Sequence, residues 1–396
     1  MPGARKKARE NGYEGAMFPW ESAWLDDGET TPVRGGVDVI TGKPVKIWSG
    51  FIEQHITSDI VFAVWQYYCV TNDQDFMDRY GYELVMDAAK FWASRLEWDG
   101  ARGKYCINDV LGPDEYKEHA NNNAFTNYMA KWTIDLAVGF CDELEREKPA
   151  LYDRLNGKLQ LKKAYGLWKE RTDKIFLPAP DKDGVLPQDD TYLSKKEIDL
   201  TPYKNQTHVG SIFKDYGIEQ INGLQVSKQA DVLLLFYLLG ALFEDRVKKA
   251  SWNYYEPRTV HDSSLSLSTH SVLASDLGNK KLAYRLFRQA AQIDLGPDML
   301  SSDHGIHAAS LGGVWQCVIN GFGGVRLNNG RLKINPHLPD EWKSLKFAVM
   351  WHGDRLRLAV DHQELTIVNE TEVNKEIEIE IRDKRVVLRK SLSVSL

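Results

Sequence analysis

Polar residues that could take part in catalysis interrupt the stretch VLGPDEYKEHANNNAFTN at residues 110–127, between two apolar segments with helical spacing. Because the Gly-Pro pair at 112–113 cannot continue a helix, we expect the Asp-Glu-Tyr at 114–116 to lie on a loop, with the next helix beginning at 121–123. Burial disfavours the charged form of a carboxyl group, so a carboxyl held on a rigid loop among aromatic side chains can act as a general acid near neutral pH. The asparagines either cap the helix or bind hydroxyl groups, and capping explains one of them more easily than all three.

A second polar cluster, FPWESAW at residues 18–24, is a proline-containing loop that presents Trp20, Glu21 and Trp24. Aromatic faces beside a carboxylate commonly bind the apolar face and the hydroxyl groups of a sugar. A buried tryptophan followed by a glutamate that starts a helix explains this segment equally well.

Two further stretches, VHDSSLSLSTH (260–270) and GIHAASLGGVWQ (305–316), place small residues where a helix is expected to begin. Small side chains let backbone amides approach an anion, and a helix N-terminus favours negative charge, so the pair resembles a phosphate cradle without being a Walker loop. Serine as a helix cap and glycine for close helix packing are the more frequent explanations. The residues concerned are Ser263, Ser264, Ser310, Gly312 and Gly313, with His261 and His307 adjacent.

The stretch KQAD at 228–231 opens a strongly apolar segment. Taken alone, Lys228 is a side chain whose stem packs on apolar surface while its ammonium group stays in water. Beside the other polar clusters, Lys228 and Gln229 become candidate ligand-binding groups.

Recognisable metal-binding and nucleophile motifs are absent from the sequence, which has no HExxH, EF-hand loop or GxSxG. The four cysteines are far apart and lack CxxC or Cys/His spacing, so we expect reduced, buried thiols. The sequence supports no metal site and no cofactor.

About nine segments between residues 54 and 321 repeat apolar residues at i, i+3 and i+4, which predicts helices. Between 175 and 222 this pattern gives way to Pro, Asp, Lys and Gly, which predicts a long irregular excursion. From about residue 325 the spacing changes to two, which predicts strands joined by tight turns. We therefore expect a helical domain over 1–324 and a small β-domain over 325–396. The clearest helical segments are 55–71, 76–98, 122–144, 228–243, 264–278, 280–295 and 307–322.

Many helices of similar length with no strands between them exclude a βαβ sheet and leave bundles, solenoids or an α/α barrel. No repeat of fixed period is visible, which disfavours a solenoid.

The bulk composition fits a protein that binds a small neutral or anionic ligand. The 396 residues carry a net charge of −6, and the charges are scattered, so no basic stripe is available for nucleic acid or anionic lipid. No window reaches the roughly 18 apolar residues of a membrane span, and the basic N-terminus lacks the apolar run of a signal peptide, so we expect a cytoplasmic location. The first residues read like the end of a helix that enters a loop, and we expect an upstream part to be missing.

Taken in order, GYEGAMFPWES, GPDEYKEHANNNAFTNYMAKW, KQADVLLL, VHDSSLS and GIHAASLGGVWQCVINGFGG resemble the motifs of glycoside hydrolase family 65. That family includes inverting α-glucoside phosphorylases. The resemblance extends from about residue 11 to the β-domain and is closest to the kojibiose and glucosylglycerol phosphorylase branch.

The resemblance implies a mainly α fold, an (α/α)6 barrel followed by a C-terminal β-sandwich, and a homodimer. The first two or three of the twelve barrel helices, and the family's upstream β-sandwich, would be missing. It also implies the site residues: Glu115 as general acid; Trp20, Glu21, Lys228 and Gln229 on the glucose; and Ser263, Ser264, His307, Ser310, Gly312 and Gly313 on the phosphate. Residues 116–119 would border the acceptor sugar.

The segment HAASLGG contains no Asp or Glu. An inverting hydrolase needs a second carboxylate to activate water, whereas a phosphorylase uses inorganic phosphate as its nucleophile, so this segment favours phosphorolysis. The expected substrates are a kojibiose-type α-linked glucose disaccharide and phosphate, and the expected products are β-glucose 1-phosphate and the free acceptor. Hydrolysis with Asp262 or Asp303 as the base, and a catalytically incompetent fragment, are the alternatives.

Overall fold

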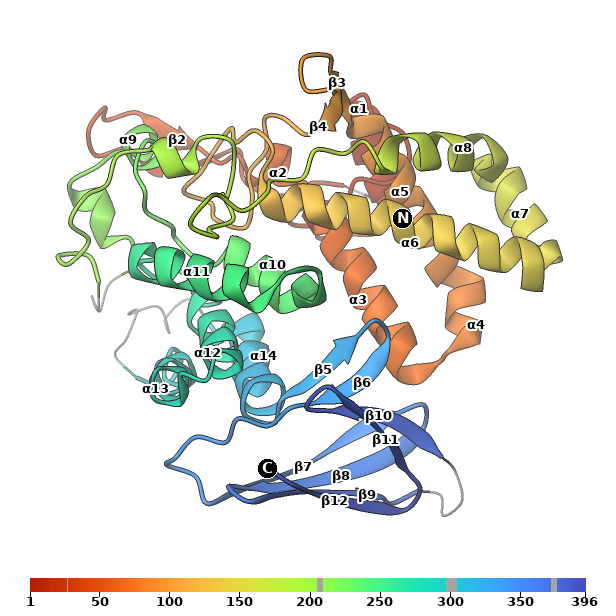
Figure 1. The fold of residues 1–396 in the computed structure, drawn as a ribbon. Coiled ribbons are helices and arrows are strands. Elements are labelled where there is room, and N and C mark those ends of the chain that lie inside the picture. Colours follow the sequence, from red (N-terminus) through yellow and green to blue (C-terminus); the bar gives the residue numbers. More distant parts are fainter. Residues whose placement is uncertain (27, 205–208, 297–304, 372–375) are drawn as a thin grey trace. The chain divides into compact units, whose positions relative to one another are not determined.

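The computed structural model describes residues 1–26, 28–204, 209–296, 305–371 and 376–396 of the chain. The chain divides into two compact units. Unit 1 consists of residues 1–65, 73–199 and 212–227, and unit 2 consists of residues 66–72, 200–211 and 228–396. Figure 1 labels the helices and strands of both units.

Unit 1 is mainly helical (Figure 1). Its helices are α1 (Pro2–Glu10), α2 (Ser49–Ile52), α3 (Ile56–Thr71, whose last turns belong to unit 2), α4 (Gln74–Phe76), α5 (Tyr82–Arg95), α6 (Ala124–Glu147), α7 (Pro149–Leu159), α8 (Leu161–Thr172) and α9 (Ile218–Asn222). Two antiparallel hairpins pair β1 (Arg34–Val37) with β2 (Pro44–Lys46) and β3 (Glu97–Asp99) with β4 (Lys104–Cys106). These hairpins correct the expectation that no strands lie among the helices. Strands of three or four residues are too short to show a spacing of two.

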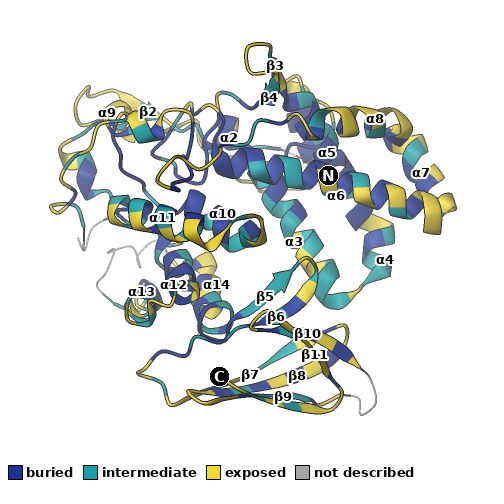
Figure 2. Cartoon of the chain, viewed as in Figure 1, coloured by how far each residue is buried: buried dark blue, intermediate teal, exposed yellow. Residues whose placement is uncertain are grey.

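Helices α5 and α6 supply large buried side chains of unit 1, among them Phe91, Trp92 and Phe125. Helix α6 begins beside the expected residues because the Asn123 side chain accepts a hydrogen bond from the N–H of Thr126 at 2.9 Å, as an N-cap does. Helices α6 to α8 each combine buried and exposed residues (Figure 2). This amphipathic character is what the apolar spacing of a surface helix predicts.

Unit 2 contains the remaining helices and the β-domain. The helices are α10 (Val232–Leu239), α11 (Asp245–Tyr255), α12 (Ser266–Asp276), α13 (Lys280–Ala291) and α14 (Ala308–Gln316), which continues into a π-helical turn at Cys317–Phe322. Helix α13 buries one apolar face, which consists of Ala283, Leu286 and Ala290. Helices α12 and α14 approach closely, because a Cβ at Gly313 would overlap Ser268 Oγ. The small residue in this part of the sequence therefore has a packing role.

The β-domain consists of two four-stranded sheets. One has the order β11-β10-β6-β5 and the other β12-β9-β8-β7. All neighbours are antiparallel except β10 and β6. Alternate residues of β8 are buried, and they join a core that includes Leu356, Leu358, Ile367 and Ile379. The strands are β5 (Val325–Asn328), β6 (Arg331–Ile334), β7 (Ser344–Trp351), β8 (Asp354–Asp361), β9 (Glu364–Asn369), β10 (Ile377–Ile381), β11 (Lys384–Leu388) and β12 (Ser391–Ser395).

Each of the seven clearest helical segments of the sequence contains a helix, and the expected strands and turns after residue 325 are present. The expected count of about nine helices is too low, because the described residues between 54 and 321 contain twelve, α3 to α14. Several of these are too short to show an apolar repeat, such as α4 and α9. The irregular excursion is confirmed over its described residues, which hold only short helical turns from 176 to 222.

In the part of the chain that the structure describes, no helix is both long and apolar enough to span a membrane. All four cysteines are free, and Cys106, Cys141 and Cys317 are buried while Cys69 is partly exposed.

Candidate active site

Glu115 lies on the loop between β4 and α6, and hydrogen bonds hold this loop at several points. Val110 and Ala120 form an antiparallel β-bridge, in which the N–H of each donates to the carbonyl oxygen of the other. The N–H of Leu111 donates to the carbonyl oxygen of Ile52 at 3.0 Å. The Gln188 side chain, from the irregular excursion, donates to the buried Asp114 carboxylate at 3.0 Å. Glu115 is therefore a half-buried carboxyl group on a rigid loop, as the sequence predicts.

Glu53, a residue that the sequence did not single out, is near Glu115 and buried, with 1% of its surface exposed. Burial raises the pKa of Glu53, and the Glu115 carboxylate raises it further. His55 lies between Glu53 (Nε2–Oε1, 3.3 Å) and Asp59 (Nδ1–Oδ2, 2.7 Å). Although burial lowers the pKa of His55, the two carboxylates raise it to about 10. The polar run EQH within an apolar stretch was the only sequence signal for this group.

Helix capping accounts for one of the three asparagines, as expected, and the other two bond to loop residues. Asn123 caps α6, and Asn121 accepts a hydrogen bond from the N–H of Asp109 at 3.0 Å. Asn122 accepts from the N–H of Ile107 and donates to Asp190. They shape the loop that carries Glu115.

Residues 116–119, expected to border the acceptor sugar, differ in accessibility. Tyr116 and Lys117 are buried, and the Lys117 ammonium group donates to the carbonyl oxygen of Ile221 at 2.8 Å. Burial lowers the pKa of Lys117 to about 8. Glu118 is half-buried, which raises its pKa to about 7, and His119 is exposed. Of these four residues, only Glu118 and His119 are accessible to a ligand in solution.

The Trp20–Glu21 loop also belongs to unit 1. Trp20 is half-buried and Glu21 is exposed, so the alternative of a buried tryptophan does not apply. No helix begins at Glu21, because the chain has no regular structure from residue 13 to β1 in its described part. The backbone N–H groups of Trp20 and Glu21 donate to the Glu29 carboxylate at 2.9 and 3.0 Å.

Lys228 and Gln229 lie in unit 2, in the irregular segment before α10, and both are half-buried. The carbonyl oxygen of Lys228 accepts a hydrogen bond from the N–H of Asp262 at 3.0 Å. This bond connects the KQAD motif directly to the segment that carries Ser263 and Ser264.

Ser263 and Ser264 are half-buried and precede α12. His261, whose φ is +57°, bonds through Nδ1 to Ser266 Oγ at 2.8 Å. Its ring meets that of buried His270 at a centroid distance of 4.6 Å. Burial, with Lys204 and Arg285 nearby, lowers the pKa of His261 to about 3, so this imidazole is neutral.

His307 immediately precedes α14, and Asp294 holds it in place. The Nδ1 of His307 lies 2.6 Å from one Asp294 carboxylate oxygen, and its backbone N–H donates to the other at 3.0 Å. The hydrogen bond with His307 lowers the pKa of Asp294. HAASLGG itself has no acidic residue, but the fold brings one to it, which sequence spacing alone did not reveal.

The remaining small residues of α14 differ in what they suggest. Ser310 is buried, and within the described residues its Oγ has no hydrogen-bond partner, as expected of a group that a ligand satisfies. Gly312 is exposed with open space at its Cβ position, whereas Gly313 is explained by contact with Ser268. Of the two carboxylates considered as hydrolytic bases, Asp262 is buried and Asp303 lies outside the described residues.

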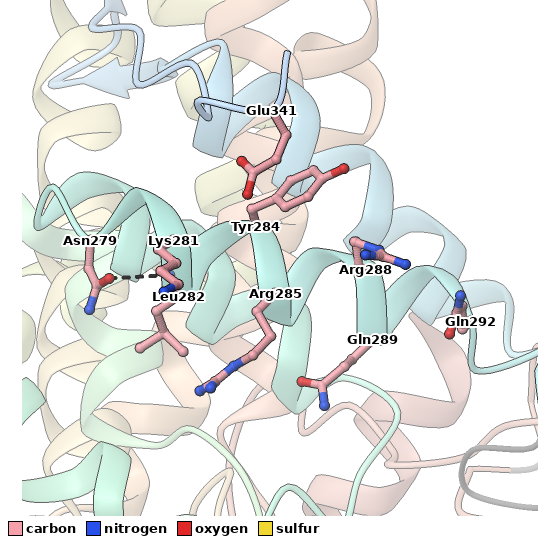
Figure 3. Close-up of a pocket in the computed structure, with 9 residues that line it drawn as sticks. All are labelled: Asn279, Lys281, Leu282, Tyr284, Arg285, Arg288, Gln289, Gln292 and Glu341. Carbon is pink, nitrogen blue, oxygen red and sulfur yellow. Dashed lines mark hydrogen bonds between the residues drawn. The ribbon is translucent and has the colours of Figure 1, made fainter.

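A groove of about 700 Å³ lies on α13 (Figure 3). It is lined by Asn279, Lys281, Leu282, Tyr284, Arg285, Arg288, Gln289, Gln292 and Glu341. None of the residues expected in the active site lines it.

Residues 1–316 match the central catalytic domain of glycosyl hydrolase family 65, and residues 325–388 match the C-terminal domain of that family. The chain belongs to glycosyl hydrolase family 65. The resemblance seen in the motifs is thus confirmed, and so is the expected fold class of a helical catalytic domain followed by a C-terminal β-domain.

Curated proteins similar to this chain include several named phosphorylases. Kojibiose phosphorylase from Halothermothrix orenii is 45% identical over 100% of this chain and 51% of its own length. Kojibiose phosphorylase from Escherichia coli K12 is 40% identical over 93% of this chain and 46% of its own. Alpha,alpha-trehalose phosphorylase from Thermoanaerobacter brockii is 35% identical over 98% and 48%.

A solved structure, a putative kojibiose phosphorylase from human microbiome, matches with a TM-score of 0.84 at 27% identity. The match covers 100% of this chain and 55% of that one. The chain spans about half the length of the curated relatives it matches.

Proposed function

We propose that this chain takes part in inverting phosphorolysis of an α-linked glucose disaccharide of the kojibiose type. The products are β-glucose 1-phosphate and the free acceptor sugar. The observation that carries the proposal is the 45% identity, over the whole chain, to a kojibiose phosphorylase. Inorganic phosphate is a co-substrate in this reaction, and we propose no metal and no cofactor.

In this proposal the Glu115 carboxyl group gives its proton to the glycosidic oxygen as the bond from that oxygen to C1 breaks. A phosphate oxygen attacks C1 from the opposite face of the sugar, which inverts the anomeric centre. Two observations support Glu115 as the acid. Hydrogen bonds fix the loop that carries it, and the residue is half-buried.

Phosphate binding is assigned to Ser263, Ser264, His307, Ser310, Gly312 and Gly313. Support comes from the buried, unsatisfied Ser310 hydroxyl and from the fixed His307 imidazole at the start of α14. A helix N-terminus and hydroxyl donors favour the binding of a dianion. Glucose binding is assigned to Trp20, Glu21, Lys228 and Gln229.

The test is a panel of α-linked glucose disaccharides incubated with the full chain and phosphate, with assay of glucose 1-phosphate and of its anomer. We expect β-glucose 1-phosphate from kojibiose, and no product without phosphate. If no disaccharide in the panel yields a sugar phosphate, the proposal is wrong and an inactive fragment becomes the better interpretation.

Hydrolysis on the same fold is the second candidate, and one observation favours it. The structure places the Asp294 carboxylate beside His307, and a hydrolase needs a carboxylate that activates water. We consider this carboxylate to be engaged by its two bonds to His307. Glucose release at equal rates with and without phosphate would decide for hydrolysis.

A further inference from the structure

We infer that the ion pair between Lys7 and Glu29 is a positioning device for the sugar site, and that it holds the Trp20–Glu21 loop in its binding conformation. The inference rests on the proposed function, since it assigns that loop to the glucose. Neither Lys7 nor Glu29 belongs to the motifs that suggested the site.

The Glu29 carboxylate is the point at which the Trp20–Glu21 loop is attached. One of its oxygens accepts the N–H of Trp20 at 2.9 Å, and the other accepts the N–H of Glu21 at 3.0 Å. The second oxygen also accepts from the Thr31 hydroxyl at 2.7 Å and from its N–H at 3.3 Å. Two successive backbone amides are therefore fixed by one side chain.

Lys7 completes the attachment from helix α1. Its ammonium group pairs with the Glu29 oxygen that receives Trp20, and only 4% of the Lys7 side chain is exposed. Burial lowers the pKa of Lys7, while Glu29 opposes that change. Burial acts to raise the pKa of Glu29, but Lys7 and the amide of Glu21 lower it overall. The carboxylate thus stays charged, and charged acceptors form the stronger hydrogen bonds.

Close packing fixes where Glu29 sits. A Cβ at Gly50 would lie 3.0 Å from Glu29 Cγ, so there is no room for the side chain to shift toward α2. A Cβ at Gly3 would lie 3.2 Å from the carbonyl oxygen of Leu25, and the N–H of Gly3 donates to that oxygen. Contacts with α1 at Leu25 and with α2 at Glu29 therefore restrict the position of the loop.

The two side chains of this loop that are assigned to the glucose, Trp20 and Glu21, depend on this backbone. Glu21 is exposed and Trp20 only half-buried, so side-chain packing does not determine their positions alone. A further backbone bond, from the N–H of Thr30 to the carbonyl oxygen of Glu21 at 2.9 Å, closes the loop over Glu29. Loss of the carboxylate leaves two amides without their acceptor and frees the loop to move.

The test compares the full chain with Glu29→Gln, which keeps the size of the side chain. A glutamine has one acceptor oxygen, so its NH₂ group must face one of the loop amides. We expect the KM for the disaccharide to rise about tenfold or more, and the KM for phosphate to stay within about twofold. A milder variant, Glu29→Asp, keeps the charge but cannot reach all its partners, and we expect an intermediate rise.

Glu83→Gln is the matched control, because Glu83 also forms an ion pair with α1, through Arg5, but does not contact the loop. We expect both KM values of this control to equal those of the unaltered chain. An unchanged disaccharide KM in Glu29→Gln and Glu29→Asp overturns the inference. Equal rises of both KM values in all three variants also overturn the inference, because they indicate that the whole fold is destabilised and not this loop alone.

Titration calorimetry with glucose separates this inference from the proposed function, because it needs no turnover. If the unaltered chain binds glucose but yields no sugar phosphate, the proposed function fails while weaker glucose binding by the Glu29 variants still supports the inference. If the unaltered chain does not bind glucose, both fail.

Discussion

At the scale of single residues, the candidate site depends on carboxylates that hold other groups. Asp114 accepts a hydrogen bond from the Gln188 side chain, and Asp294 bonds to the His307 ring. Glu29 accepts hydrogen bonds from two backbone amides of the loop. None of these roles is visible from residue type alone, because Asp and Glu are common on any protein surface. The loop position of Glu115 was predictable, since the Gly-Pro pair before it cannot continue a helix.

Replacing Glu115 by Gln removes the proton donor while it preserves size and polarity. We expect phosphorolysis to fall by roughly 10² to 10⁴, the usual contribution of acid catalysis, with glucose binding nearly unchanged. Steady-state rates and glucose titration measure the two effects. Normal turnover by this variant would refute the assignment of the acid.

Replacing Asp294 by Asn removes one of the two hydrogen bonds that position His307. An amide side chain has a single acceptor oxygen, so it cannot accept from both Nδ1 and the backbone N–H as the carboxylate does. We expect the KM for phosphate to rise, by less than in His307→Ala, and the KM for the disaccharide to change little. Initial-rate kinetics with each substrate varied in turn give both values. A rise confined to the disaccharide KM contradicts the phosphate assignment.

At the scale of elements, the ends of helices and the loops between them carry the candidate site. Glu115 precedes α6, His307 precedes α14, Lys228 precedes α10, and Ser263 precedes α12. These positions were predictable because helix ends have sequence signals, such as the Asn123 cap of α6. Which elements pack together was not, since Gly313 against Ser268 depends on close approach of α12 and α14.

The start of α3 provides a test of pH dependence through His55, which is 4% exposed. Its pKa is about 10 in the folded chain and about 6.5 in an unfolded one. The group therefore contributes its full stability below about pH 6.5, and that contribution is lost as the pH rises through about 10.

We expect the difference in unfolding free energy between the unaltered chain and His55→Gln to shrink as the pH rises from about 6.5 to 10. Urea unfolding at several pH values measures this difference. Comparison with the variant matters because Lys117, whose pKa is lowered to about 8, changes stability in the opposite direction over part of that range. A difference that grows with pH would rule out a charged His55.

At the scale of the whole molecule, the chain consists of the two domains that it matches in family 65, the central catalytic domain and the C-terminal domain. We propose that the chain forms a homodimer, in line with the family resemblance, and that it is located in the cytoplasm. Light scattering after size exclusion is expected to give about twice the chain mass of 45.2 kDa. A mass near that of one chain would contradict the dimer.

By itself the sequence determined the local features of this protein: the helices and strands with clear apolar spacing, the loop that must follow Gly112, and the ordered motifs that indicate the family. Those features depend on contacts within one or two turns of chain, which residue spacing records directly. Only the tertiary structure decided that Glu53 lies near Glu115, that Asp294 meets His307, and that Lys7 reaches Glu29. The partners in each pair belong to different turns or elements, so their meeting depends on how helices and loops pack, and packing leaves no periodic trace in a single sequence.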